Sequence, residues 1–331
     1  MKLLPPSPTV CVLLLLLLSA APDAAQMVDG STPELVLRRS AEEVVLSFSV
    51  TDSEGRLVDG LQVQDFAVLD NDQAIRHFTS FQKDCGLALR LGLLVDLSDS
   101  TAKAFRAEQA AAIGFLQGIL RPEGDEAFVL GFRQTSDVKV RSERDATRLI
   151  EALNRFRPGG QTALYDAIFQ ATTQELMLRQ EQHPVRRVLV LLSDGEDNDS
   201  WRTAAQAIQA AQRADVAIYA IALRRMDQRS QGDNILRRLT AETGGRILFF
   251  DNHGGNAEMF SRLEQELRGR YTITYRRAEA PLAGGFHQLR VVIDSQRKLQ
   301  AHCKVGYYAF AQQELCEACP ASASFKPLGQ N

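Results

Sequence analysis

Three oxygen-bearing side chains alternate along a short segment in the first third of the chain. Asp96, Ser98 and Ser100 are separated by single residues and follow an apolar run that ends at Val95. Such spacing can turn one carboxylate and two hydroxyl groups toward a common point. Hard oxygen ligands of low total charge suit Mg²⁺, and Mn²⁺ accepts the same set. Because Asp and Ser are also common turn residues, this segment indicates a divalent metal site only if other ligands join it.

Two later segments offer those ligands. A second apolar run, at 187–193, is followed by Asp194 and Gly195, and a glycine loop at 158–161 leads into a helix through Thr162, in an N-cap position. The carboxyl ends of parallel strands meet at one edge of a sheet, where doubly wound proteins bind ligands. We therefore predict one metal site, with Mg²⁺ as the cofactor and Mn²⁺ as the alternative, formed by Asp96, Ser98, Ser100, Thr162 and Asp194.

The elements that position these residues alternate along the chain. Strands buried on both faces of a sheet are predicted from nearly continuous apolar runs, which lie at 87–95, 127–132, 187–193, 216–221 and 246–250. Helical spacing follows at 102–120, 146–156, 163–178, 201–213, 234–243 and 258–267. This alternation implies βαβ units with right-handed crossovers. We predict an α/β fold with a doubly wound, mostly parallel, Rossmann-like sheet.

Both flanks of this region have a strand-only pattern. Residues 44–50 alternate between apolar and polar side chains, which is typical of a half-buried strand, and a second strand is expected near 66–69. Later strands are predicted at 271–275, 288–293 and 304–308. The flanks form either one small β-sandwich, with the α/β domain inserted into it, or two separate β units.

The first 25 residues have the pattern of a secretory signal peptide. The apolar run at 10–18 is shorter than the roughly 20 residues that a membrane span needs, and small residues follow it. We expect an exported protein, periplasmic or extracellular, with no membrane span after cleavage; an uncleaved anchor is the alternative. The predicted divisions are a signal peptide at 1–25, an N-terminal β region at 40–84, the α/β domain at 85–269, a C-terminal β region at 270–310 and a mobile tail at 311–331.

Cysteine content and composition fit this picture. Cys11 lies in the apolar run, so the mature chain keeps an even number of cysteines, which suggests disulfides; their pairing stays open among Cys85, Cys303, Cys316 and Cys319. The 331 residues are 45% hydrophobic and 24% charged, with a formal net charge of −3, so there is no basic excess for nucleic acid. The scattered histidines and the glycine pairs match no catalytic dyad or nucleotide loop.

The series Asp96-x-Ser98-x-Ser100, Thr162 and Asp194 resembles the metal-ion-dependent adhesion site of von Willebrand factor A (VWA) and integrin inserted domains. The resemblance covers roughly residues 87–267, and the whole chain resembles bacterial exported proteins of this superfamily. It implies that both serines ligate the ion directly, that the threonine does so when a partner is bound, and that the two aspartates act mainly through water. A partner carboxylate then fills the open coordination position.

The resemblance has one departure and leaves alternatives. Position 99 is Asp where the family commonly has a small residue; its charge either tightens cation binding or weakens the attraction of an acidic partner. We predict a non-enzymatic, metal-dependent adhesion or scaffold module whose protein partner presents an acidic side chain. The alternatives are an envelope protein in which the ion only ties loops together, and a metal-assisted hydrolase with Asp99, Asp166 or Glu196 as its base. The acidic run at 196–199 does not match an EF-hand and is expected to cap the helix at 201–213.

Overall fold

The computed structural model describes residues 43–308, apart from 85, 104, 123, 179–180, 182–183, 223–229, 251–255, 278–284 and 294–297. The predicted signal peptide and the predicted mobile tail lie outside the described residues, as do Cys11, Cys85, Cys316 and Cys319. Cys303 carries a free thiol, and the pairing of the other cysteines stays a prediction. Among the described residues, no helix combines the length and the apolar character that crossing a membrane requires.

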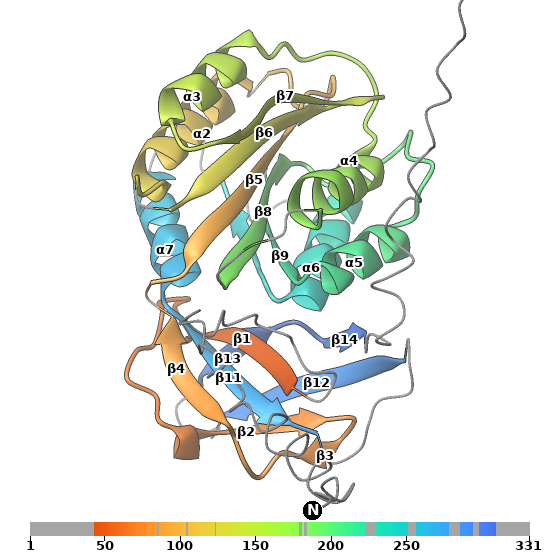
Figure 1. The fold of residues 1–331 in the computed structure, drawn as a ribbon. Coiled ribbons are helices and arrows are strands. Elements are labelled where there is room, and N and C mark those ends of the chain that lie inside the picture. Colours follow the sequence, from red (N-terminus) through yellow and green to blue (C-terminus); the bar gives the residue numbers. More distant parts are fainter. Residues whose placement is uncertain are drawn as a thin grey trace, which may run out of the picture. The chain divides into compact units, whose positions relative to one another are not determined.

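A six-stranded sheet forms the centre of the α/β region, in the order β10-β9-β8-β5-β6-β7 (Figure 1). Its strands are β5 (Ala88–Asp96), β6 (Glu126–Phe132), β7 (Ser136–Glu143), β8 (Val185–Ser193), β9 (Val216–Ala222) and β10 (Ile247–Phe249). Five strands run parallel, and β7 is antiparallel to β6 at one edge. Every residue of β5 from Leu91 to Asp96 is buried, as the continuous apolar run predicts.

Helices cover both faces of this sheet (Figure 1). They are α2 (Phe105–Ile119), α3 (Ala146–Arg155), α4 (Leu164–Gln170), the π-helix η2 (Ala171–Leu176), α5 (Ala204–Arg213), α6 (Gln231–Thr243) and α7 (Asn256–Arg268). The helices α2, α3 and α7 pack with Leu91 and Leu93 in one core, whereas α4, α5 and α6 pack with Leu94 in a second. The side chains of β5 thus alternate between two cores, and the predicted α/β fold class is confirmed.

The flanking strands combine into two antiparallel sheets. One sheet has the order β13-β1-β11-β4, from β1 (Glu43–Thr51), β4 (Ser80–Asp84), β11 (Arg270–Arg276) and β13 (Gln300–Cys303). The other has the order β14-β12-β2-β3, from β2 (Phe66–Asp70), β3 (Gln73–Ala74), β12 (Phe286–Ile293) and β14 (Gly306–Tyr308), and a 3-10 turn, η1 (Val63–Asp65), precedes β2. Because β1 pairs with β11 and β2 with β12, each sheet joins strands from both flanks around one shared core. The two flanks therefore form one β unit into which the α/β domain is inserted, and not two separate units.

The boundaries of several predicted helices and strands differ from those in the structure. The helix expected at 201–213 begins only at Ala204, because the side chain of Thr203 accepts a hydrogen bond from the Gln206 backbone and caps it. The helix expected at 163–178 ends as a π-helix. The strand expected at 304–308 is found as β14, which begins only at Gly306, and a further strand, β13, lies before Lys304 in a different sheet.

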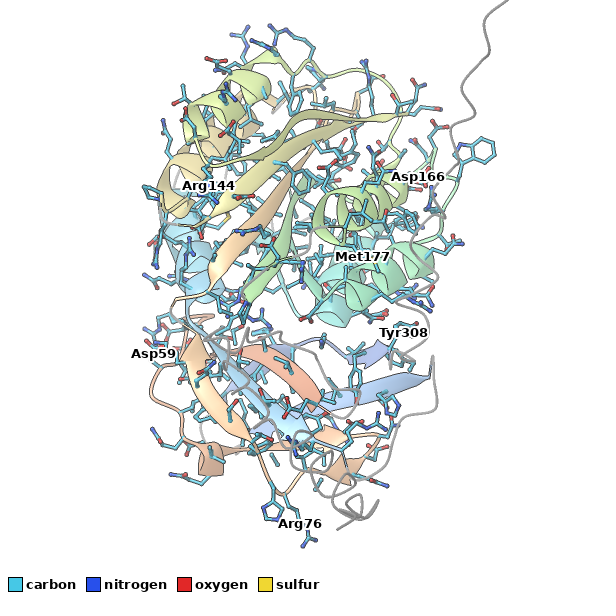
Figure 2. The ribbon with its side chains drawn as sticks, viewed as in Figure 1. Asp59, Arg76, Arg144, Asp166, Met177 and Tyr308 are labelled. Carbon is cyan, nitrogen blue, oxygen red and sulfur yellow. The ribbon has the colours of Figure 1, made fainter. Side chains whose placement is uncertain are left out.

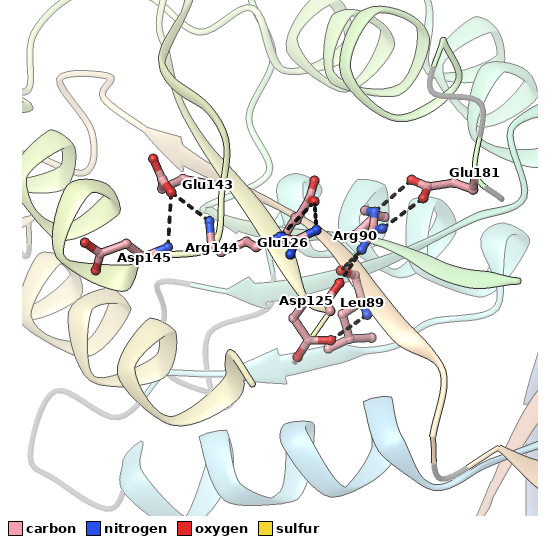
Figure 3. Close-up of polar contacts among 9 residues, drawn as sticks. Leu89, Arg90, Asp125, Glu126, Glu143, Arg144, Asp145 and Glu181 are labelled. Carbon is pink, nitrogen blue, oxygen red and sulfur yellow. Dashed lines mark hydrogen bonds and ion pairs between the residues drawn. The ribbon is translucent and has the colours of Figure 1, made fainter. Parts of the chain in front are cut away.

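Polar contacts fix the amino ends of the parallel strands (Figure 3). The carboxylate of Asp125 accepts hydrogen bonds from the backbone of Leu89, at 2.7 Å, and of Arg121, at 2.9 Å. It also pairs with Arg268 at the end of α7. Arg90 of β5 donates two hydrogen bonds to Glu181, at 2.7 and 2.8 Å. These contacts tie the amino ends of β5 and β6 to the end of α7 and to the segment before β8.

Candidate metal centre

The predicted site residues lie on three loops at the carboxyl edge of the sheet. Asp96 is the last residue of β5, and Asp194 directly follows the last residue of β8. These strands are neighbours, with Val95 opposite Leu192. The third loop leads from α3 to α4 and carries Thr162. Parallel pairing of β5 and β8 therefore places both aspartates at one edge.

Backbone hydrogen bonds tie the three loops together. The Gly159 N–H donates to the Leu97 carbonyl at 2.6 Å, and the Asp99 N–H donates to the Gly160 carbonyl at 3.0 Å. Thr162 exchanges two bonds with Asn198: its N–H donates to the Asn198 side chain at 2.8 Å, and its carbonyl accepts from the Asn198 N–H at 3.0 Å. The Asp96 loop is thus fixed to the Thr162 loop, and the Thr162 loop to the Asp194 loop.

The carboxylate of Asp96 is completely buried and held from two sides. Oδ1 accepts from the Ser98 N–H at 2.9 Å, and Oδ2 accepts from the Ser193 hydroxyl at 2.7 Å. Burial raises the pKa of Asp96 to about 6, although the hydrogen bonds from Ser98 and Ser193 oppose that shift. The Ser98 and Ser100 hydroxyl oxygens lie 3.0 Å apart. One oriented carboxylate and two adjacent hydroxyl groups therefore occupy the first loop.

Thr162 does not have the capping role that the sequence suggested. The N-cap of α4 is Ala163, without a side-chain cap, so the predicted position is wrong by one residue. The loop that holds the acidic run 196–199 and Ser200 caps this helix instead: the Ser200 hydroxyl accepts from the backbone of Tyr165 at 3.1 Å and of Asp166 at 3.2 Å. The expectation that this loop caps the next helix is therefore wrong. Because Ser200 caps the start of α4, the loop that carries it lies against the Thr162 loop.

Asp194 is positioned by the close approach of two backbones. Gly195 has φ +80°, in the left-handed region that favours glycine. A Cβ at Gly195 would lie 2.3 Å from the Gly232 carbonyl oxygen, and a Cβ at Gly232 would lie 2.1 Å from the Asp194 carbonyl oxygen. The start of α6 therefore packs directly on the Asp194 loop. The Asp194 Oδ1 accepts from the Glu196 N–H at 3.1 Å.

Asp166, one candidate base for hydrolysis, lies in the first turn of α4 (Figure 2). Its two oxygens accept from the backbones of Trp201 and Arg202, at 3.0 and 3.2 Å, and from the Arg202 guanidinium at 3.0 Å. Burial raises the pKa of Asp166, but these hydrogen bonds outweigh it and leave the pKa below its ordinary value. Asp166 therefore anchors the loop before α5.

The family follows from the sequence of the same region. Residues 91–262, just over half of the 331-residue chain, match the von Willebrand factor type A domain family. The chain belongs to this family. No match was found among curated proteins.

Solved structures resemble this VWA chain at low sequence identity. BatB from Bacteroides thetaiotaomicron is 14% identical and covers 55% of this chain and 100% of its own, with a TM-score of 0.45. A von Willebrand factor type A protein from Catenulispora acidiphila is 13% identical and covers 80% of this chain and 73% of its own, with a TM-score of 0.47. Proximal thread matrix protein 1 from the mussel byssus, with a zinc-occupied MIDAS motif, is 17% identical and covers 60% and 49%, with a TM-score of 0.46. The family assignment rests on the sequence match.

The VWA domain also places at this edge a carboxyl group that the sequence reading missed. Glu108 on α2 is only 1% exposed, and neither of its oxygens has a hydrogen-bond partner among the described residues. Burial and the charges of Asp96 and Asp194 raise the pKa of Glu108 to about 8. The sequence does indicate that Glu108 is buried, because it lies in helical register with the apolar residues Phe105 and Ala112 of α2.

The donor chemistry of this edge fits a divalent cation. Asp96, Glu108 and Asp194 are all less than 5% exposed, and burying acidic groups without compensating positive charge is costly. Within the described part of the chain, no three His, Cys, Asp or Glu side chains gather closely enough to chelate one ion. The hydroxyl groups of Ser98 and Ser100, which lie 3.0 Å apart, supply further oxygen donors at this edge. Mg²⁺ and Mn²⁺ accept such oxygen ligands.

Trp201 is a second residue that the sequence analysis did not single out. It is the only tryptophan of the chain and is 94% exposed. It lies outside α5, in the loop that Asp166 anchors, and its neighbour Arg202 stacks on the Phe169 ring at 4.0 Å from the centroid. The VWA domain therefore presents a large aromatic surface on the loop that follows Asp194.

Proposed function

We propose that this VWA domain binds an exported protein partner through a divalent ion, Mg²⁺ or Mn²⁺. Asp96, Ser98, Ser100, Thr162 and Asp194 would hold the ion, and a carboxylate of the partner would complete its coordination. The hydrogen-bonded union of three loops around the buried Asp96 carboxylate carries this proposal. It provides a preorganised set of neutral and anionic oxygen donors, and the ion would supply a positive charge that attracts the partner's acidic group.

The residues of the chain act mainly by orientation. Ser193 and the Ser98 backbone fix the Asp96 carboxylate, and Asn198 fixes the backbone of Thr162. Asp166, a candidate base in the first turn of α4, accepts hydrogen bonds from Trp201 and Arg202. This removes one of the three candidate bases for metal-assisted hydrolysis, which needs a base that is available to an attacking water. The apolar run at 10–18 supports export.

Removal of the metal tests the function directly. The purified chain should retain a partner from the exported fraction in Mg²⁺ and lose it in EDTA. Ser98→Ala should lose the partner in both buffers, because one donor of the ion is gone. The matched control is Ser261→Ala, which changes an exposed serine on α7 and should behave like the wild type. Equal retention in Mg²⁺ and EDTA would contradict the proposal. A lower melting temperature in EDTA, with no partner in either buffer, would favour the purely structural role.

Trp201 provides a separate prediction about the partner. Exposed tryptophans are enriched among residues that dominate binding energy, and the Trp201 backbone is held by Asp166. We expect Trp201→Ala to lower affinity for the partner about tenfold or more and to leave Mn²⁺ affinity unchanged. Trp201→Phe should restore part of the loss. Titration of the partner in Mg²⁺ and of Mn²⁺ without partner measures the two effects. Unchanged partner affinity in Trp201→Ala would exclude this surface from the interface.

A further inference from the structure

We propose that Glu108 is a third carboxylate of the metal centre, which lies behind the ligands and strengthens the binding of a divalent cation without chelating it. This inference rests on the proposed function, since it concerns the same ion. It assigns a task to a buried acidic residue that the family motif does not include.

The position of Glu108 in α2 requires an explanation. The buried side of this helix consists otherwise of apolar side chains: Phe105, Ala112, Phe115, Leu116 and Ile119. Glu108 shares that side and is 1% exposed, yet among the described residues no hydrogen-bond donor meets either of its carboxyl oxygens. A buried polar group without partners destabilises a fold, so this group costs stability that an apolar residue would not.

The charges that act on Glu108 point toward the metal centre. Its two electrostatic neighbours are Asp96 and Asp194, both negative when ionised. Three acidic groups in one buried region repel each other without a cation, whereas a doubly charged ion reverses the sign of the interaction. Water screens buried charges poorly. A carboxylate here can therefore attract the ion from behind the ligand layer.

The structure also separates this role from direct ligation. Among the described residues, no three acidic, His or Cys side chains converge on one point that could hold an ion. Glu108 therefore does not join both aspartates in a chelating cluster. It acts either through its charge or through a water molecule, as residues behind metal ligands commonly do.

Isosteric neutralisation tests the proposal. Glu108→Gln keeps the shape and removes the charge. We expect the Mn²⁺ dissociation constant to rise about tenfold, the lower end of the range for residues behind metal ligands, and the melting temperature of the metal-free protein to stay equal or rise. Glu108→Met, also unbranched and uncharged, should weaken Mn²⁺ binding similarly, and Glu108→Asp should restore part of the affinity. Calorimetric titration with Mn²⁺ and thermal unfolding in EDTA provide these values.

The control is a second buried glutamate far from the ion. Glu175 is 7% exposed and lies on η2, several helical turns after Thr162. Glu175→Gln should leave Mn²⁺ affinity within about twofold of the wild type. If the folded Glu108→Gln and Glu108→Met proteins also bind Mn²⁺ within twofold of the wild type, the inference is wrong while the proposed function stands. If the wild type binds no Mn²⁺, the metal centre itself is refuted, and the inference with it.

Discussion

Asp194→Ala is expected to lower the affinity of the protein for Mn²⁺ by about 100-fold, the upper end of the range for residues behind metal ligands, because it removes one of the two carboxylates of the proposed site. Asp96 and Asp194 are the two carboxylates of the predicted set, and the remaining donors are neutral hydroxyl groups. Neutral oxygens cannot replace the lost charge in a buried site. The Asp194 side chain is 4% exposed, so the effect is not screened as it would be at the surface.

The fold should survive this substitution, which makes the measurement clean. The loop keeps its contact with α6, since that contact is between backbone atoms of Asp194, Gly195 and Gly232. Titration of Mn²⁺, monitored by calorimetry or by the magnetic resonance signal of the free ion, gives the affinity. Asp99→Ala is the matched control, because Asp99 is exposed on the first loop and carries the same charge. Its loss should change the affinity by less than about threefold. Equal losses in the two variants would show that general negative charge, and not ligation, binds the ion.

Gly232→Ala is expected to lower the free energy of unfolding by about 3 kcal/mol, the upper end of the usual cost of overpacking. The new Cβ would lie 2.1 Å from the Asp194 carbonyl oxygen and 2.9 Å from the Gly195 carbonyl carbon. Both atoms belong to the backbone, so relief requires α6 or the Asp194 loop to move. We therefore expect weaker Mn²⁺ binding in this variant as well.

A second glycine provides a control of opposite sign. Gly118 is exposed on α2, and a Cβ there would meet nothing within 4 Å. Gly118→Ala should raise the free energy of unfolding by up to about 1 kcal/mol, because alanine loses less conformational entropy in a helix. Urea unfolding of both variants in EDTA measures the two effects. If Gly232→Ala stabilises the protein as Gly118→Ala does, α6 does not press on the Asp194 loop.

The candidate site shows which structural features can be predicted from local sequence patterns. Continuous apolar runs predicted β5 and β8 as buried parallel strands, and their ends placed Asp96 and Asp194 at the same edge. Strand burial and helical spacing depend on neighbouring residues in the chain, so they can be read without tertiary contacts. The fold class follows from that reading and is confirmed. The assignment of the five metal ligands stays a prediction, because ligation depends on the ion itself.

Contacts between segments that are far apart in the chain determine the position of Glu108, the capping of α4 and the pairing of the flanking strands. Helical register placed Glu108 on the buried side of α2, but only the folded chain brings it near Asp96 and Asp194. The N-cap of α4 is Ala163 and not Thr162, and the distant Ser200 accepts the hydrogen bond from the Tyr165 backbone at the start of this helix. The two flanks share their sheets through pairing across the whole α/β region.

The sequence by itself therefore determined the α/β fold, the order of its elements and the segments that carry oxygen donors, since each depends on residues near one another in the chain. Only the tertiary structure decided which backbones touch, which carboxyl groups are buried together and which loops are tied to each other. Gly232 shows the physical reason. Helix propensity alone predicts that alanine stabilises this position, yet an oxygen of the distant Asp194 occupies the space that its Cβ needs.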